Sequence, residues 1–556
     1  MNTVTPMYEW NTLPWKEIQR KVFKLQKRIY QASLQNEPSK VRKLQKLMVS
    51  SWIAKALAVR KVTQDNRGKR TAGIDGCKNL SPKKRLELVN QIKVNEKAQP
   101  VRRIWIPKPG KQEKRPLGIP TIRERARQAL IKLALEPEWE AKFENNSYGF
   151  RPGRSAHDAI EAIFSGITKM PKFVFDADIK ACFDKINHVA LLEKLECSCN
   201  IKRAIKDWLK AGILEGNKVF PSEEGAPQGS ILSPLLANIA LHGLQTSITK
   251  SFVERKTLQS GKKMLWKPIV VRYADDFLIF HPDLPSLQKA ATIARLWLKD
   301  VGLEINEEKS SIKHTFFKHE GYKSGFDFLG FTVKQYQTVK NTTGIKTIIS
   351  PSKKSIDKHQ NSFKELLRSH RGHSQEMLIR ELNPKISGWS NYFSSVCSKE
   401  TFSKMDYLLF WKIYRWANNK NPKTAKRRLV AKYWKKWKFI TKEGYRLNLH
   451  TEKVITRHTK VKLNRTPFDG DLIYWSTRMG KSLLLPRNKA KALKLQKGKC
   501  HYCNLIFLPD DVIEIYHPIA VAKDGKKDLS NTRVVHGHCH DCLSNQNKEV
   551  LMTEAN

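Results

Sequence analysis

The chain has 556 residues, with 103 lysines and arginines against 52 acids and a formal net charge of +51. So large an excess would repel itself without a polyanionic partner, and aromatic residues interleaved with the basic ones favour RNA, because rings stack on unpaired bases. A membrane protein is excluded by the lack of an apolar stretch of ~18 residues or a lipidation signal, and the length suggests about three or four domains.

The N-terminal sequence MNTVTPMYEWNTLPWKE has neither a basic leader nor an apolar core, so no signal peptide is predicted. Four of the nine cysteines lie within residues 500–542, which favours metal binding in a reducing compartment over disulfides. We therefore expect a cytoplasmic location in a bacterium, or an organellar one.

Along the chain, residues 15–60 are basic with a helical period and end near a glycine-rich loop. Strands and turns then alternate to about residue 345, with one long helix in RERARQALIKLALEPEW. From 350 to 420 apolar residues recur every three or four positions, which predicts helices. Residues 421–495 are basic and aromatic with weak periodicity, and a compact Cys/His module follows.

The segment RRIWIPKPGKQEKRPLGIP predicts a hairpin whose turn carries cations. Lys108 and Arg115 flank its Pro-Gly turn and could both face a bound triphosphate, the alternative being an exposed basic hairpin. Further on, GAPQGSILSPLLANI is a loop leading into an apolar helix, and its Gln228 can line a base-pair pocket without charge.

Acidic residues follow two predicted buried strands. Asp275 and Asp276 interrupt PIVVRYADDFLIF, which predicts a tight turn between strands, and Asp176 and Asp178 share one face of a strand upstream. Adjacent buried carboxylates need a cation, and oxygen-only ligands favour Mg²⁺. Three carboxylates on neighbouring strands suit phosphoryl transfer with two metals, whereas the acidic pair alone could also be an exposed turn.

The C-terminal module has the ligand spacing of a zinc site. Cys500-x2-Cys503 and His536-x2-Cys539 supply four nitrogen and sulfur ligands, and Cys542 could replace His536 as the fourth. A unit of about 60 residues has too small a core to be stable without a metal or cross-link, which favours a structural zinc ion.

Several sequence blocks occur in a fixed order: RPLGIPTIRERARQAL, NSYGFRPGRSAHDAI, VFDADIKACFDKI, GAPQGSILSPLLANI, RYADDFLIF, LEINEEKSSI and FDFLGF. Together they resemble the ordered blocks of group II intron reverse transcriptases. The region with NPKISGWSNYF resembles the maturase (X) domain of that family, which is the polymerase thumb. The Cys/His module resembles the HNH endonuclease domain that many members carry.

The resemblance covers nearly the whole chain and implies an α+β fold: a right-hand polymerase with a zinc-stabilised ββα-metal module. The implied division is a helical N-terminal extension with the start of the fingers (1–95), fingers and palm (96–345), thumb or maturase domain (346–425), basic DNA-binding region (426–490) and HNH-like domain (491–556).

Carried over by position, the resemblance makes Asp178, Asp275 and Asp276 the catalytic ligands of two Mg²⁺ ions. Phe183 matches a steric gate that screens the ribose 2′-hydroxyl, although it could also be a core phenylalanine on a helix. Tyr273 would pack near the primer end. The full nucleotide-binding set would be Lys108, Arg115, Phe183, Gln228 and Tyr273.

In the HNH-like module the resemblance makes His517 the general base, gives Asn531 the role of pinning the loop through backbone hydrogen bonds, and makes His540 the ligand of one divalent ion. The family places Asp or His before the base, but this chain has Tyr516, and a neutral phenol is a poor ligand for a hard cation. Glu514 on the same strand face is a candidate substitute. We hypothesise that DNA cleavage is weakened or lost while zinc-held DNA binding remains.

The implied function is an RNA-directed DNA polymerase that binds its intron RNA to assist splicing and supports retrohoming into DNA. Its partners would be group II intron RNA, target DNA and deoxynucleoside triphosphates, with no membrane. The alternative is a splicing-only maturase without polymerase activity, which would be free to lose the acids that this chain retains. A retron or diversity-generating enzyme is disfavoured by the maturase-like helices and the nuclease-like tail. The sequence leaves the oligomeric state open.

Overall fold

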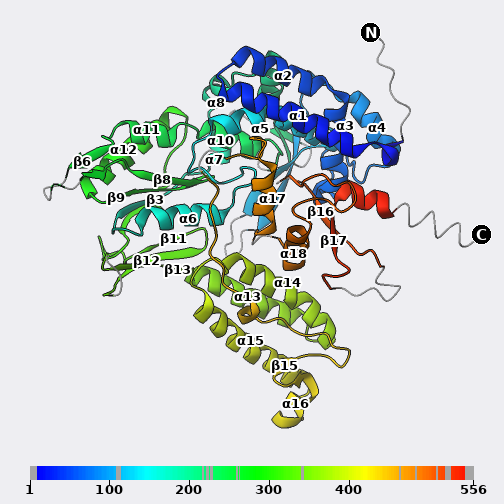
Figure 1. The fold of residues 1–556 in the computed structure, drawn as a ribbon, viewed down its shortest axis with the longest axis vertical. Coiled ribbons are helices and arrows are strands. Elements are labelled where there is room, and N and C mark those ends of the chain that lie inside the picture. The colour runs from blue at the N-terminus through cyan, green and yellow to red at the C-terminus, as the bar shows by residue number, and fades with distance from the viewer. Residues whose placement is uncertain are drawn as a thin grey trace, which may run out of the picture.

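The computed structural model describes residues 9–107, 114–215, 218–220, 225, 229–257, 261, 263–339, 343–462, 465–482, 485–508, 511–519 and 528–544. Figure 1 shows N-terminal helices over one end of a mixed body of helices and sheets, and a lobe of helices projecting from its other end. The C-terminal elements return to the N-terminal helices.

The basic N-terminal segment forms helices α1 (Trp15–Leu34), α2 (Pro38–Ser50), α3 (Trp52–Arg60) and α4 (Pro82–Gln91), with short turns of helix at η1 (Trp10–Thr12), η2 (Lys61–Asp65) and η3 (Arg67–Arg70). Helix α1 buries Ile18, Val22 and Ile29 and packs on the long helix α5 (Ile122–Lys142). The prediction of helices over residues 15–60, and of a long helix in RERARQALIKLALEPEW, is confirmed.

The predicted hairpin is present as strands β1 (Val101–Pro107) and β2 (Lys114–Ile119), which pair antiparallel. They join β4 (Ile213–Glu215) and β5 (Lys218–Phe220) in a sheet of order β2-β1-β4-β5.

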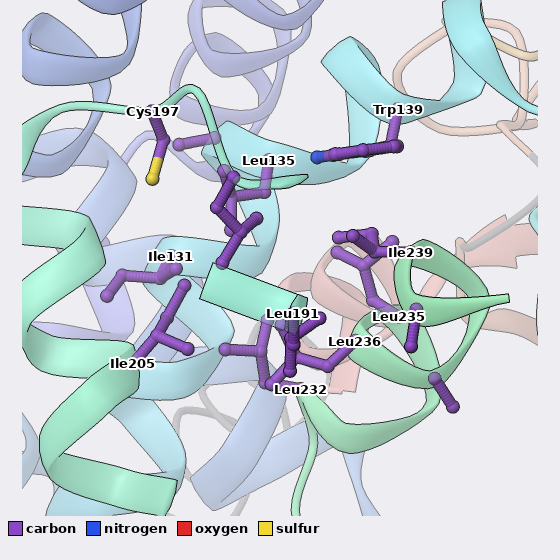
Figure 2. Close-up of a cluster of buried hydrophobic side chains, with 14 of the residues drawn as sticks. Ile131, Leu135, Trp139, Leu191, Cys197, Ile205, Leu232, Leu235, Leu236 and Ile239 are labelled. Carbon is purple, nitrogen blue, oxygen red and sulfur yellow. The ribbon is translucent and has the colours of Figure 1, made fainter. Parts of the chain in front are cut away.

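Helices α8 (His188–Lys194), α9 (Cys199–Lys210) and α10 (Ser233–Ala240) pack around α5. Figure 2 shows this core, where Ile131 and Leu135 of α5 lie among Leu191, Ile205 and leucines of α10.

The central sheet consists of β3 (Phe173–Asp178), β8 (Ile269–Tyr273), β9 (Asp276–His281) and β10 (Ser311–His314), in the order β10-β3-β9-β8 with antiparallel neighbours. Its side chains alternate between two buried faces. Phe175 and Phe277 join the cluster under α12 (Leu284–Asp300), whereas Val174 and Leu278 join the cluster under α6 (Ala156–Ile167).

Further short elements surround the central sheet. A second sheet of order β11-β12-β13 continues the α6 cluster, and the remaining pieces are two helices and a hairpin. Their bounds are β11 (Phe326–Phe328), β12 (Phe331–Gln337), β13 (Ile345–Pro351), α7 (Cys182–Lys185), α11 (Leu244–Lys250), β6 (Arg255–Thr257) and β7 (Lys263–Leu265). The region up to residue 345 therefore contains more helix than the sequence predicted, because α6, α9 and α12 are amphipathic covers of sheets rather than strands and turns.

The helical lobe is built from α13 (Lys353–Ser369), α14 (Gln375–Phe393), α15 (Lys399–Lys420) and α16 (Lys426–Tyr433), followed by a hairpin of β14 (Trp434–Lys435) and β15 (Lys438–Phe439). The predicted apolar periods of α14 and α15 form its core, with Leu382, Ile386, Leu409 and Ile413 buried. The prediction of helices from 350 to 420 is confirmed. Figure 1 shows β15 and α16 at the end of the lobe farthest from the sheets.

The C-terminal part contains the short turn η4 (His450–Glu452), α17 (Leu472–Gly480), α18 (Arg487–Leu495), and the antiparallel pair β16 (Ile513–Tyr516) and β17 (Arg533–His536), after which residues 537–544 are helical. Contacts that dock it on the N-terminal helices include hydrogen bonds that Asp541 accepts from Arg60 (2.8 Å) and Gln64 (2.7 Å). Within the described ranges, none of the helices combines the length and apolarity that crossing a bilayer requires.

Candidate functional site

One end of the central sheet gathers the acids predicted from the sequence. Strand register places Asp178 of β3 directly opposite Asp276 of β9. Tyr273 pairs with Asp276 across the β8–β9 hairpin, which leaves Ala274 and Asp275 as its two-residue turn. Side chains on directly opposed residues of antiparallel strands lie about 5 Å apart at Cβ. The structure therefore brings the three aspartates together.

The electrostatics of this end of the sheet favour a bound cation. Burial, together with the neighbouring charges of Asp275 and Asp178, raises the pKa of Asp276 to about 7. Lys309 Nζ lies 2.9 Å from Asp178 Oδ2, and Lys313 Nζ lies 2.8 Å from Asp176 Oδ2. These ammonium groups offset part of the negative charge. The donor set consists of carboxylate oxygens, which are the ligands that Mg²⁺ prefers.

The turn that carries Asp275 is braced by the NSYGF segment. The Tyr148 amide donates to the Arg272 carbonyl (2.9 Å), and a Cβ on Gly149 would lie 2.4 Å from the Ala274 nitrogen, so only glycine fits there. The buried Arg272 guanidinium donates to Ala274 O (3.2 Å) and to Asn238 Oδ1 (3.0 Å). These contacts fix where the acidic turn lies relative to β3.

The predicted nucleotide-binding residues are placed only in part. Phe183 lies on α7, half-buried, with its ring 6.2 Å edge-on from Phe150, and Tyr273 is half-buried at the end of β8. Arg115 lies on β2 opposite Ile106, and nothing is described of its side chain. Lys108 and Gln228 lie outside the described residues.

A second group of possible ligands lies in the C-terminal module. Cys500, Cys503, His536 and Cys539 are buried, and their ligand atoms all lie within 4.8 Å of one another. Cys503 Sγ is 3.3 Å from His536 Nδ1. Of the two candidates for the fourth position, the group in the described residues contains His536 and does not include Cys542.

The orientation of His536 is set by an acid behind it. Asp511 Oδ2 lies 3.3 Å from His536 Nε2 and also accepts a hydrogen bond from the Leu508 amide (2.7 Å), and the other oxygen of the carboxylate accepts one from Gln19 of α1. Although burial opposes protonation, the hydrogen bonds to Asp511 and the cysteines raise the pKa of His536 to about 11. A carboxylate on the far nitrogen is how metal-ligating histidines are commonly oriented.

The predicted nuclease residues lie on and beside the β16–β17 pair. His517 Nδ1 lies 2.8 Å from the Asn531 carbonyl, which leaves Nε2 as the nitrogen that can accept a proton. The Asn531 side chain bonds both the amide and the carbonyl of Ile519 (2.9 and 2.8 Å), closing the loop. His540 Nδ1 lies 3.0 Å from Glu514 Oε2.

Comparison with known proteins begins with the sheet that carries the acids. The family model "Reverse transcriptase (RNA-dependent DNA polymerase)" matches residues 106–333, which include all three aspartates. Protein YkfC of Escherichia coli (strain K12) is 31% identical over 335 residues, which cover 53% of this chain and 84% of that protein. The chain belongs to the reverse transcriptase family. Its fold is accordingly a mixed helix-and-sheet polymerase fold.

Two more family models match this reverse transcriptase. The N-terminal domain of reverse transcriptase matches residues 10–92, and the group II intron maturase-specific domain matches residues 356–434. The protein is therefore an RNA-directed DNA polymerase joined to an intron maturase domain, as expected of an intron-encoded reverse transcriptase.

Among similar proteins, the group II intron-encoded protein LtrA of Lactococcus lactis subsp. cremoris is 27% identical over 430 residues, covering 62% of this chain and 69% of that protein. Maturase-like protein 1 of Euglena gracilis is 29% identical over 392 residues, covering 68% and 76%. A solved telomerase from Candida albicans in complex with a fragment of telomeric RNA covers 61% of both chains at 14% identity, with a TM-score of 0.32.

Sequence reasoning missed the residues that support the site. Lys309 lies in the block LEINEEKSSI, and the sequence did not indicate that it contacts Asp178. Arg272 directly precedes Tyr273 in an otherwise apolar strand, and a cation buried beside two acids could have been recognised there. Asp511 gave no signal, because only the fold places it behind His536.

Proposed function

We propose that Asp178, Asp275 and Asp276 are the catalytic acids of this reverse transcriptase and hold two Mg²⁺ ions. The observation that supports this is the cross-strand pairing of Asp178 with Asp276, next to the turn that carries Asp275. The raised pKa of Asp276 fits the proposal, because a carboxylate crowded by like charges gains most from a bound cation.

The reaction needs little covalent chemistry from the protein. When bound, the two magnesium ions would activate the primer 3′-hydroxyl and neutralise charge on the leaving pyrophosphate. The aspartates supply the oxygens that fix the positions of those ions. Lys309, which bonds Asp178 here, would keep the acids ordered before nucleotide arrives and limit their mutual repulsion. Arg272 and Gly149 hold the turn rigid, so that Asp275 and Asp276 keep a fixed distance from Asp178.

The nucleotide would lie beside this cluster. Phe183 and Tyr273 are assigned the steric gate and the primer end, and the half-buried ring of Phe183 against Phe150 supports a rigid wall there. Lys108 and Arg115 would hold the triphosphate and Gln228 the incoming nucleotide, as proposed from the sequence.

Primer extension on an RNA template tests the acids. Asp178→Asn keeps the shape of the side chain but removes one of the three carboxylates, and we expect extension to fall by about a thousandfold. Asp176→Asn is the matched control, because it removes an acid two residues away on the same strand face that bonds Lys313 instead. Extension by Asp178→Asn at the level of the control would refute the assignment.

We also propose that the protein binds its own intron RNA to assist splicing and to support retrohoming into target DNA. The maturase-specific match and the group II intron-encoded relative support this, together with the net charge of +51. Splicing assistance should persist in Asp178→Asn, since it depends on surface binding and not on the metal site. A splicing-only maturase would instead show no extension in the unaltered protein.

We propose the same domain boundaries as the sequence implied: N-terminal extension (1–95), fingers and palm (96–345), thumb (346–425), basic region (426–490) and HNH-like domain (491–556). The separate clusters of the body, the helical lobe and the C-terminal module support a division into these three parts. The body cluster joins residues 1–95 to 96–345, and the lobe cluster continues past residue 425 to Leu447. Within 426–490, residues 440–490 would contact target DNA, whereas the basic surface of residues 350–440 would contact intron RNA.

We propose that the C-terminal module binds Zn²⁺ through Cys500, Cys503, His536 and Cys539. The four ligand atoms are buried and close enough to share one ion, and Asp511 orients the histidine. The donor set fits zinc because thiolates and imidazole are its preferred ligands. Metal analysis of the purified protein checks this proposal. Zinc should be lost in Cys500→Ser and kept in the control, Cys542→Ser.

For the HNH-like residues we propose DNA binding with weakened cleavage. Asn531 bonds the backbone of Ile519, the Nδ1 of His517 faces the Asn531 carbonyl and His540 lies beside Glu514, but Tyr516 stands where a metal-ligating Asp or His is expected. Protein with intron RNA would be given a labelled double-stranded target. Efficient cutting that His517→Ala abolishes would refute weakened cleavage, and loss of DNA binding on zinc removal would support the binding role.

A further inference from the structure

The outer face of α15 carries aromatic rings where a surface helix usually carries polar side chains. The inner face is buried in the lobe, with Met405, Leu409 and Ile413 in its core. Tyr407 and Trp411 on the opposite face are 62% and 43% exposed. An exposed apolar patch of this kind marks an interaction surface.

These rings form a continuous chain that ends at the β14–β15 hairpin. We call this set the aromatic platform: Tyr407, Phe410, Trp411, Tyr414 and Trp437. Ring centroids along it are separated by 6.3 Å (Tyr407–Trp411), 5.5 Å (Phe410–Trp411) and 6.4 Å (Phe410–Trp437). Trp437 is 78% exposed, so contact with Phe410 covers little of its ring. The contact with the lobe core therefore does not explain why a tryptophan stands at this position.

The backbone at Trp437 is held in an unfavourable conformation. Lys435 pairs with Lys438, so Lys436 and Trp437 form a two-residue hairpin turn, with φ of 49° and 63°. Left-handed φ at both positions is typical of turns built from Asn-Gly, and a residue with a Cβ is strained there. Strain of this kind is found where function requires a particular side chain.

The charge around the platform is almost wholly positive. Between Lys404 and Phe439 the sequence has 12 lysines and arginines and one acid, Asp406. Asp406 accepts hydrogen bonds from His450 and Thr451, so its charge is already engaged. Lys435, Lys436 and Lys438, the neighbours of Trp437 in the hairpin, are exposed. Exposed rings among exposed cations are the recognised arrangement for binding a single strand, whose phosphates meet the cations and whose bases stack.

We propose that the aromatic platform is a stacking site for unpaired RNA bases, with Trp437 at its centre. The proposal rests on the proposed intron-RNA function and deepens it, by naming an unpaired strand as the ligand and stacking as its chemistry. RNA is favoured over DNA because α15 and α16 lie in the region matched by the intron maturase-specific domain, and the hairpin follows directly. Figure 1 places the hairpin at the far end of the lobe, away from the polymerase acids, so the platform would hold RNA that is not being copied.

The test is a binding titration of the full chain with a short labelled RNA that has no secondary structure. Trp437→Ala should weaken binding roughly tenfold, in the range measured for loss of one stacked base, and Trp437→Phe should restore most of it. The loss should persist at high salt, because stacking is not screened as charge is. Tyr336→Ala is the matched control: Tyr336 is 44% exposed and lies on β12, outside the platform.

A double variant separates binding from structure. Lys436→Asn with Trp437→Gly supplies the pair that this turn prefers, so it should leave the melting temperature unchanged or raised while RNA binding falls as in Trp437→Ala. Lys436→Asn alone keeps the ring and should give a smaller loss that disappears at high salt. Unchanged RNA affinity in both Trp437→Ala and the double variant would overturn the proposal.

Two further arms fix the ligand. RNA annealed into a duplex should bind Trp437→Ala and the unaltered chain with the same affinity. If Trp437→Ala loses as much affinity for the duplex as for the single strand, stacking on unpaired bases is refuted. A matching single-stranded DNA is the competitor, and DNA binding that is tighter than RNA binding and equally dependent on Trp437 would overturn the choice of RNA. Primer extension in Trp437→Ala should stay normal. If the unaltered chain fails to extend a primer, the polymerase role is refuted. The RNA titration still tests the stacking site, because it does not depend on extension.

Discussion

The three aspartates and the Cys/His group are both proposed as metal-ligand sets, and the fold holds them in different ways. Asp178 and Asp276 are neighbours in one sheet whose two faces are buried under helices. Cys500, Cys503, His536 and Cys539 belong to a module with a small core that includes three of these cysteines. The module also contacts the N-terminal helices, where Gln19 and Arg60 donate hydrogen bonds to it.

The comparison teaches where each site gets its stability. A site built on sheet register is fixed by the body's core before any metal binds, so its negative charges can stay only partly offset by nearby lysines. A site in so small a module depends on its metal, because few other buried side chains remain to hold it. Five predictions would break or sharpen this contrast.

Removing a zinc ligand should have the largest effect. Cys500→Ser, or a chelator that prefers zinc to magnesium, should unfold the module, since structural zinc contributes on the order of 10 kcal/mol to small domains. Limited proteolysis should then cut within residues 491–544, while primer extension persists because the sheet does not need zinc. Cys542→Ser is the control. An intact module without zinc would show that docking on the N-terminal helices suffices.

The next largest effect is expected at Asp158, which ties the C-terminal part to the central body. Its fully buried carboxylate accepts hydrogen bonds from Val461 N (2.8 Å), His458 (3.2 Å) and Arg478 (2.5 Å). Asp158→Asn leaves the Arg478 charge without its buried partner and should cost about 3–5 kcal/mol at pH 7. Thermal unfolding measures it.

The same residue gives a pH dependence. Burial alone would raise the pKa of Asp158, but hydrogen bonds and charges from His458 and Arg478 lower it to about 2. A folded-state pKa below the ordinary 3.8 means that the stabilisation is complete above about pH 4 and is lost as the pH falls towards 2. The gap in melting temperature between Asp158→Asn and the unaltered protein should therefore close in that window. A constant gap would show that charge is not the cause.

Gly149→Ala should cost polymerase activity without unfolding the protein. Its new Cβ would lie 2.4 Å from the Ala274 nitrogen, so the acidic turn must move away from Asp178. A displacement near 1 Å is expected to lower the extension rate by about a hundredfold. Gly372→Ala is the control, because nothing lies within 4 Å of a Cβ there. Full activity in Gly149→Ala would mean that the turn is not rigid.

The smallest effect concerns docking of the module. Asp541 is half-exposed and bonds the buried Arg60 at 2.8 Å, so Asp541→Asn should lower stability by about 1 kcal/mol, more at low salt than at high. Glu17→Gln is the control, since both members of the Lys21–Glu17 pair are exposed. Protease accessibility of residues 528–544 measures the undocking. No change at any salt would show that the interface does not depend on this pair.

Much of the polymerase site could be predicted because its signals are local. Two acids between apolar runs and a third on another apolar strand require buried strands with a turn, and the residues YADD and FDAD carry that pattern on their own. The helices of α1, α14 and α15 were predictable for the same reason. The covering helices within 96–345 were not, since short amphipathic helices and strands give similar patterns in so brief a stretch.

By itself the sequence indicated the reverse transcriptase class, the candidate acids and the ligand spacing of the Cys/His module, because each depends on residue identity and local spacing. Its net charge favours a polyanionic partner. Only the tertiary structure chose His536 over Cys542, put Lys309 beside Asp178, and placed Trp437 on a strained turn beside the exposed rings of α15. Those outcomes depend on packing between segments far apart in the chain, which no local pattern encodes.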